Sequence, residues 1–63
     1  MNNIEFLNKL LEKFKEEIIS ASGDDKNLIV FIKINDSIKE IEITDFSEEN
    51  FERICLQIEN YKK

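Results

Sequence analysis

The stretch Leu28-Ile-Val-Phe-Ile-Lys-Ile34 decides the fold of this chain, together with Ile38-Lys-Glu-Ile-Glu-Ile-Thr44 after it. β-Branched and aromatic residues fill the first stretch, and apolar residues alternate with charged ones in the second, a pattern typical of strands. The intervening residues 35–37, Asn-Asp-Ser, have the chemistry of a turn. We therefore predict an antiparallel hairpin made of strands 28–34 and 38–44.

The alternation also predicts which face of the hairpin is buried. With residues 36–37 at the tip, Val30 faces Ile43 across the hairpin and Lys33 meets Glu40 on the opposite face. A slip of one residue would bury the charges, so the parity of the register is well specified. Six apolar side chains make up the expected core face: Leu28, Val30, Ile32, Ile34, Ile41 and Ile43. Three others on the opposite face form a candidate apolar interface: Ile29, Phe31 and Ile38.

Helical periodicity flanks the hairpin on both sides. Apolar residues recur at spacings of three and four over residues 3–21, which predicts an amphipathic helix that starts after Asn2 and ends at Gly23, the only glycine. A second helix is predicted over residues 48–61 after the N-cap Ser47. The buried stripe of the first helix is expected to be Ile4, Leu7, Leu11, Phe14, Ile18 and Ala21. That of the second is expected to be Phe51, Ile54, Cys55, Ile58 and Tyr61.

These elements predict one α+β domain, residues 1–63, in the order α-β-β-α. A two-stranded hairpin is marginal alone, so both helices are expected to pack on one face of the antiparallel hairpin. Its two edges stay unpaired unless another strand covers them. Phe6, Ile19 and Leu56 lie off the helical stripes and either fill corners of the core or contact a partner or a second copy.

The composition leaves little for catalysis. The chain has no histidine, which excludes histidine-based acid–base chemistry and histidine metal ligands, and one glycine cannot build a phosphate-binding loop. Cys55 falls on a predicted buried stripe, where a thiol behaves as a small inert hydrophobe. We expect a protein that is not an enzyme and has no cofactor and no metal.

Acidic residues gather in one part of the sequence. The chain carries 14 acidic and 9 basic residues, a net charge of −5. Between Asp36 and Glu52 seven acids stand against Lys39 alone, and these seven are the candidate partner-binding residues: Asp36, Glu40, Glu42, Asp45, Glu48, Glu49 and Glu52. Such a charge argues against nucleic acid or an anionic membrane as a direct ligand and favours a basic protein surface. The simpler alternative is an exposed acidic face with acids that complement a helix dipole.

The whole chain resembles the small acidic phage-encoded anti-CRISPR proteins that inhibit type II CRISPR nucleases. The resemblance rests on its tiny size, its Ile-, Asn-, Lys- and Glu-rich composition, the helix-hairpin-helix order and the acidic stretch from Asp36 to Glu49. It implies an inhibitor in the cytoplasm of a bacterial host cell, with some members acting as DNA mimics. The seven carboxylates would then stand in for phosphates that face Arg and Lys of the nuclease. These inhibitors share no signature, so no residue is carried over position by position.

Two other functions stay open. The chain could be a homodimeric structural or regulatory module in which Ile29, Phe31 and Ile38 pack on a second copy, or in which the hairpin edge pairs with its twin. It could also be an antitoxin or immunity protein that neutralises a basic toxin. The first residues lack the basic and apolar regions of a signal peptide, so an intracellular, cytoplasmic protein is expected.

Overall fold

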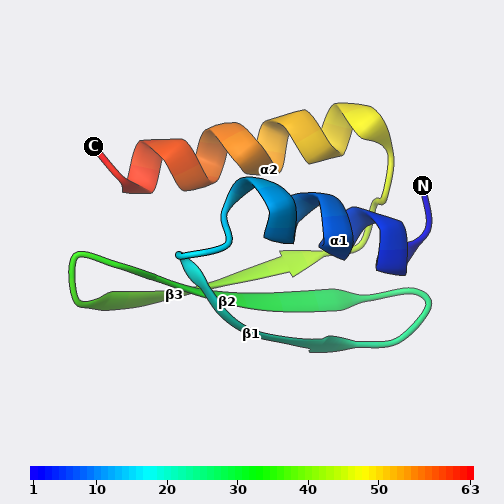
Figure 1. Ribbon diagram of the computed structural model, residues 1–63. Coiled ribbons are helices and arrows are strands. Elements are labelled where there is room, and N and C mark those ends of the chain that lie inside the picture. The colour runs from blue at the N-terminus through cyan, green and yellow to red at the C-terminus, as the bar shows by residue number, and fades with distance from the viewer.

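Two helices pack on one face of a three-stranded antiparallel sheet in the computed structural model, which describes residues 1–63 (Figure 1). The α+β class and the placement of both helices on one face are confirmed, and the predicted hairpin is present as β2–β3, but the sheet has three strands instead of the predicted two because another strand precedes the hairpin. The strand order in the sheet is β1-β2-β3. The elements are α1 (Asn3–Lys13), β1 (Ile18–Gly23), β2 (Leu28–Ile34), β3 (Ser37–Ile43) and α2 (Glu48–Tyr61).

The third strand comes from the end of the segment predicted as a long first helix. That helix stops at Lys13, and β1 pairs antiparallel with β2, Ser20 opposite Phe31 and Gly23 opposite Leu28. Residues 18–23, Ile-Ile-Ser-Ala-Ser-Gly, are mediocre helix formers, and the strand hydrogen-bonds an edge of β2 that would otherwise be bare. Gly23 therefore ends a strand, not a helix.

The buried face of α1 is also different from the predicted stripe. Phe6 and Leu10, which were not on the predicted stripe, are 0% exposed, whereas Ile4 is 65% exposed and Leu11 37% exposed. Phe14 is buried as predicted. Both sets have helical spacing, so periodicity alone does not choose between them. The Phe6 ring packs edge-on against the rings of Phe46 and Phe51, and this packing turns the side of α1 that carries Phe6 toward the core. The predicted N-cap is confirmed, because Asn2 Oδ1 accepts a hydrogen bond from the Glu5 N–H at 2.8 Å.

The β2–β3 hairpin has the predicted core face with a shifted register. Val30 pairs with Ile41, not with Ile43, and the turn consists of Asn35 and Asp36 instead of residues 36–37. Both turn residues have positive φ, 52° and 66°, as in the type I′ turns that two-residue hairpins favour. The shift is by two residues, so every side chain keeps its face. All six predicted core positions on β2 and β3 are buried.

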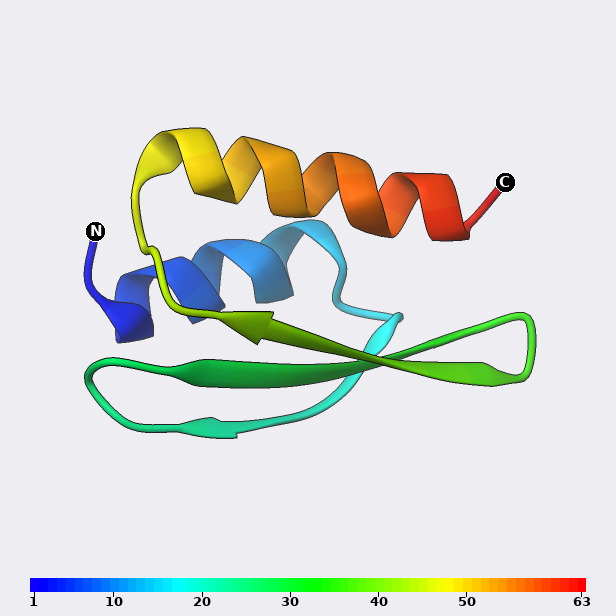
Figure 2. The ribbon, with the colours of Figure 1, turned by 180° about the vertical axis from the view of Figure 1, so that it is seen from behind.

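The core lies between the sheet and the two helices, as the opposite view shows (Figure 2). α2 begins at the predicted N-cap, where Ser47 Oγ accepts a hydrogen bond from the Asn50 N–H at 3.2 Å. The helix buries Ile54, Cys55 and Ile58 as predicted. Burial raises the pKa of the Cys55 thiol, which keeps the thiol protonated and unreactive.

Candidate functional site

The outer face of the sheet carries the first pair of predicted carboxylates. Because Ile41 and Ile43 of β3 point into the core, the alternate residues Glu40 and Glu42 point away from the helices. Their spacing of two residues along a strand sets the Cα atoms about 6.7 Å apart. The two side chains are exposed, on a strand that forms one edge of the sheet.

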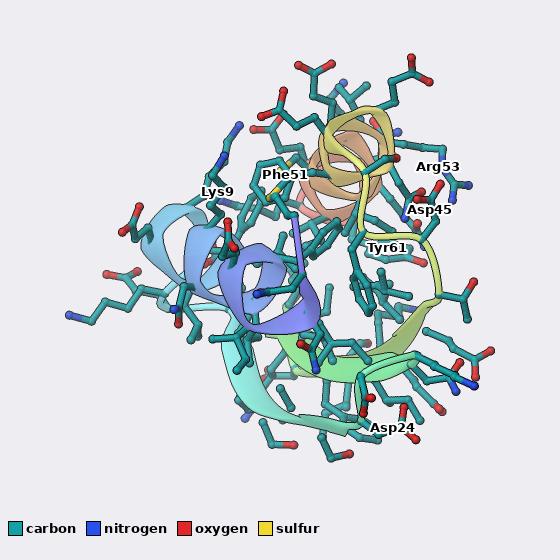
Figure 3. The ribbon with its side chains drawn as sticks, turned by 90° about the vertical axis from the view of Figure 1, so that its right-hand side faces the viewer. Lys9, Asp24, Asp45, Phe51, Arg53 and Tyr61 are labelled. Atoms are coloured by element: carbon teal, nitrogen blue, oxygen red, sulfur yellow. The ribbon has the colours of Figure 1, made fainter.

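The candidate apolar interface shares this outer face. Ile29 lies opposite Glu42 and Phe31 opposite Glu40, both partly buried, and Ile38 is 60% exposed. Both helices lie on the other side of the sheet (Figure 3). The face is therefore a mixed one, in which apolar side chains on β2 are bordered by carboxylates on β3.

A second group of predicted residues lies where α2 begins. Asp45 Oδ1 accepts a hydrogen bond from the Ser47 N–H at 3.0 Å, and the Asn50 side-chain amide donates to the Asp45 carbonyl at 2.6 Å. Asn50 Oδ1 in turn accepts from Arg53 Nε at 2.9 Å, so the guanidinium lies on the same side of α2 as Asp45 and Glu49 (Figure 3). This small network positions the helix start and puts a positive charge beside its two carboxylates.

Glu48 and Glu52 lie at the edge of α2 nearest to α1, where Glu52 also borders the solvent-facing side of the helix. Lys9 Nζ is 3.8 Å from Glu48 Oε1, with the two side chains 50% and 80% exposed. An ion pair so exposed contributes about 0–1 kcal/mol and is screened by salt. Lys9 also lies 5.9 Å from the centre of the Phe51 ring, so its position is explained by packing as much as by charge.

The solvent face of α2 presents an apolar side chain among acids. Leu56 is 61% exposed, and helical spacing puts Glu52 and Arg53 one turn before it, Glu59 one turn after it and Glu49 two turns before it. We name Leu56, Glu49, Glu52 and Glu59 the α2 ridge. Glu59 was not among the predicted residues. The signal that could have found it was Leu56, an apolar residue off the buried stripe with glutamates at helical spacing on both sides.

The seven predicted carboxylates therefore do not share one face. Asp36 lies in the turn between β2 and β3, at the end of the sheet opposite the loop that leads into α2 (Figure 1). Glu40 and Glu42 lie together on the outer face of the sheet, and the remaining predicted acids lie on or just before α2, on the other side of the sheet. The fold brings the acids together as two separate surfaces plus the turn.

Few of these acids are neutralised within the molecule. Only two ion pairs occur, Lys9–Glu48 and Lys62–Glu17, so six of the seven predicted carboxylates lie more than 4 Å from the charged group of any lysine or arginine. The second pair joins the segment before β1 to the end of α2 at 2.8 Å. Its hydrogen bond lowers the pKa of Glu17 and raises the pKa of Lys62. Apart from Glu48, the predicted carboxylates therefore have no ion-pair partner within the molecule.

Other features of the molecule add little to the choice of function. Its surface hollows are open and measure about 210 to 390 Å³. No group of three or more cysteine or carboxylate side chains has a metal-binding arrangement, and neither helix is long and apolar enough to span a membrane. Comparisons with protein-family models, curated protein sequences and solved structures find no match to this chain. Its function therefore has to be argued from its own surfaces.

Proposed function

We propose that this protein is a non-catalytic binding protein whose α2 ridge attaches to a basic surface of a macromolecular partner. One observation carries the proposal: Leu56 is 61% exposed on a helix whose neighbouring Glu49, Glu52 and Glu59 form no ion pair within the molecule. A single exposed leucine is common on protein surfaces, so the proposal depends on the carboxylates beside Leu56 as much as on the leucine itself. The same arrangement suits a partner that offers an apolar socket bordered by Lys and Arg.

The two kinds of side chain contribute different parts of the interaction. Burying a leucine completely stabilises a complex by about 1.5–3 kcal/mol, so the exposed part of Leu56 supplies about 1–2 kcal/mol. The carboxylates accelerate association with a basic partner and discriminate against acidic ones. Such a site binds through a central apolar anchor with a charged rim, the usual anatomy of a protein–protein interface.

The partner we propose is a nuclease with a basic nucleic-acid-binding groove, in the first place a type II CRISPR nuclease. The support is the resemblance to small acidic anti-CRISPR proteins, together with acids on both sides of the molecule. A flat partner would engage either the α2 ridge or the row of Glu40 and Glu42, whereas a groove that closes around the small domain would engage both. Inhibition would follow because the bound protein occupies the site of the nucleic acid.

Charge-reversal variants test this proposal and separate the two acidic surfaces. Glu49→Lys with Glu52→Lys alters the α2 ridge, and Glu40→Lys with Glu42→Lys alters the outer face. Each pair changes the net charge from −5 to −1. The matched control, Glu12→Lys with Asp25→Lys, makes the same change at exposed positions outside both surfaces and belongs to the same assay.

The assay is inhibition of DNA cleavage by the guide-loaded nuclease, with circular dichroism as the check that each variant is folded. We expect the ridge variant to lose inhibition and the control to keep it. Inhibition by the original chain should weaken between about 0.1 M and 1 M salt, because the screening length falls from about 10 Å to 3 Å. Full inhibition by the ridge variant would refute the role of α2. Absence of inhibition by the original chain would refute the nuclease as partner and favour the antitoxin or immunity alternative.

A further inference from the structure

The free edge of β1 is unusual for the edge of a sheet. Segment 18–23 contains no charged residue and no proline, and all its residues except Ile18 are exposed. The opposite edge, β3, carries Lys39, Glu40 and Glu42, the kind of charged residues that keep edge strands from pairing. A bulge between Ile18 and Ser20 interrupts only the first part of β1. Residues 20–23 pair regularly with β2, and the backbone on their outer side is free to pair with another strand.

The hydrogen bonds of the β1–β2 hairpin identify the free backbone groups. The Asp24 N–H donates to the Asn27 carbonyl at 2.8 Å, next to the pair formed by Gly23 and Leu28. Bonded and non-bonded pairs alternate along an antiparallel ladder, so Ser22 and Ser20 bond to β2. Ala21 and Gly23 consequently point their N–H and C=O groups away from β2, toward the free edge.

Helix α1 extends over this edge with unused apolar side chains. α1 lies on the β1 side of the sheet, and the Asn3 side-chain amide donates to the Asp24 carbonyl at 2.8 Å (Figure 3). Beside the buried stripe, Ile4 and Leu11 are exposed, and Leu7 is partly buried against the core.

A groove marks where an additional strand would lie. Ile4 and Leu7 of α1 form one wall, and Ala21, Ser22 and Gly23 of β1 form the other. Its volume of about 210 Å³ is smaller than that of a typical small-molecule site. An extended strand fits better, because it would hydrogen-bond to the free backbone groups of β1.

We propose that a second copy of this chain occupies this edge, by antiparallel pairing of the two β1 strands about a two-fold axis at Ala21. This register bonds the outward groups of one Ala21 to those of the other and pairs Ser20 of each copy with Ser22 of its partner. Only small side chains then meet at the centre of the interface. The result is a continuous six-stranded sheet with α1 of both copies on the same face.

The distribution of charge favours self-association at this edge. Residues 1–35, which include α1, β1 and β2, carry six acids and five bases, whereas residues 36–63 carry eight acids and four bases. The net charge of −5 therefore divides into −1 and −4, with the larger share on β3 and α2. Pairing through β1 places the two acidic parts at the far ends of the dimer, where their repulsion is least. The α2 ridges stay exposed, so the dimer is independent of the proposed partner.

The size of the interface predicts a concentration-dependent dimer. The chain exposes 4409 Å² over 63 residues, about 70 Å² per residue. Complete covering of the six residues of β1 and the three apolar residues of α1 would bury about 600 Å² per copy, so about 1,200 Å² for the pair is the upper limit, and it only reaches the lower end of the range for stable interfaces. We expect monomer at low micromolar concentration and dimer well below millimolar.

Sedimentation equilibrium over this concentration range tests the proposal. The mass should rise from 7.5 kDa toward twice that value. Ala21→Pro removes an N–H that does not bond to β2, so it should leave the chain folded and monomeric. If that variant fails to fold, Ile4→Lys with Leu11→Lys makes the same test on the exposed side of α1. The matched control is Ile38→Lys, since Ile38 is 60% exposed and Ile4 65% exposed; it should dimerise like the original chain.

A cross-link measures the register directly. Ala21→Cys in a Cys55→Ala background should form an intermolecular disulfide on mild oxidation, since bonded partners in antiparallel strands have Cα atoms about 5.5 Å apart. Ser47→Cys in the same background should not. Monomer at every concentration would overturn the proposal. So would a dimer that Ile38→Lys disperses and Ala21→Pro leaves intact, which would assign the second copy to the outer face.

Discussion

Replacing Phe6 with leucine tests which side of α1 holds the domain together. Phe6 is 0% exposed, and its ring lies 5.6 Å from that of Phe46 and 5.3 Å from that of Phe51, at interplanar angles of 67° and 81°. The control is Ile4→Ala on the same helix, at a position that is 65% exposed. The two substitutions probe the buried and the exposed stripe of α1 respectively.

The expected magnitudes differ clearly. Each edge-to-face aromatic pair contributes about 0.5–1.5 kcal/mol beyond area burial, and leucine fills the cavity only in part, so Phe6→Leu should destabilise the domain by about 2 kcal/mol. Ile4→Ala should change stability by less than about 0.5 kcal/mol, because an exposed apolar contact is lost while helix propensity improves. A domain of this length has a total stability of about 3–9 kcal/mol. Phe6→Leu is therefore preferred to Phe6→Ala, whose cost of about 3–5 kcal/mol could unfold the chain.

The measurement is urea denaturation followed by far-UV circular dichroism at low micromolar concentration, where self-association does not contribute. With a slope of about 1 kcal/mol per molar urea, Phe6→Leu should lower the midpoint by about 2 M and Ile4→Ala should leave it almost unchanged. Equal losses for the two variants, or a larger loss for Ile4→Ala, would refute this orientation of α1. A double-mutant cycle that combines Phe6→Leu with Phe46→Leu should give a coupling of about 0.5–1.5 kcal/mol.

Three further predictions concern the backbone, pH dependence and the thiol. Gly23→Ala should destabilise the domain by about 1–3 kcal/mol in urea denaturation, because Gly23 has φ +151° and a Cβ there would collide with the Asn27 carbonyl; an unchanged midpoint would contradict this geometry. The hydrogen bond from Lys62 lowers the pKa of Glu17, so its stabilisation is present above the unfolded-state pKa, near 4.5, and is lost as pH falls through the folded-state value. The difference in melting temperature between the original chain and Glu17→Gln should accordingly be present at neutral pH and vanish in acid, and a difference that persists in acid would count against the pair. Cys55 is 4% exposed with a raised pKa, so its reaction with a disulfide reagent should be slow in the native state and rise with urea in parallel with unfolding; rapid native labelling would show an open core.

Local sequence determined the elements whose signals are short-range. The side-chain acceptors Asn2 and Ser47 start the two helices as expected, since an N-cap acts on backbone groups two or three residues away. The alternation of apolar and charged residues in β3 determined the faces of the β2–β3 hairpin even though the register shifted by two residues, because side-chain direction depends only on parity. The stretch between Asp36 and Glu52 likewise determined that the chain is acidic in its second half.

Tertiary structure alone decided the rest. Ile18 fitted the period of a helix and lies in a strand, because the hydrogen bonds that β1 forms with the edge of β2 depend on residues distant in sequence. Ile4 and Phe6 both had helical spacing, and packing against the aromatic side chains near α2 buried only Phe6. The acids of β3 and α2 are neighbours in sequence but lie on opposite sides of the sheet, because the chain reverses direction between Ile43 and Glu48 to lay the helix over the core. Sequence therefore determined which charges the protein carries, and the path of the chain in space decided which of them a partner can meet together.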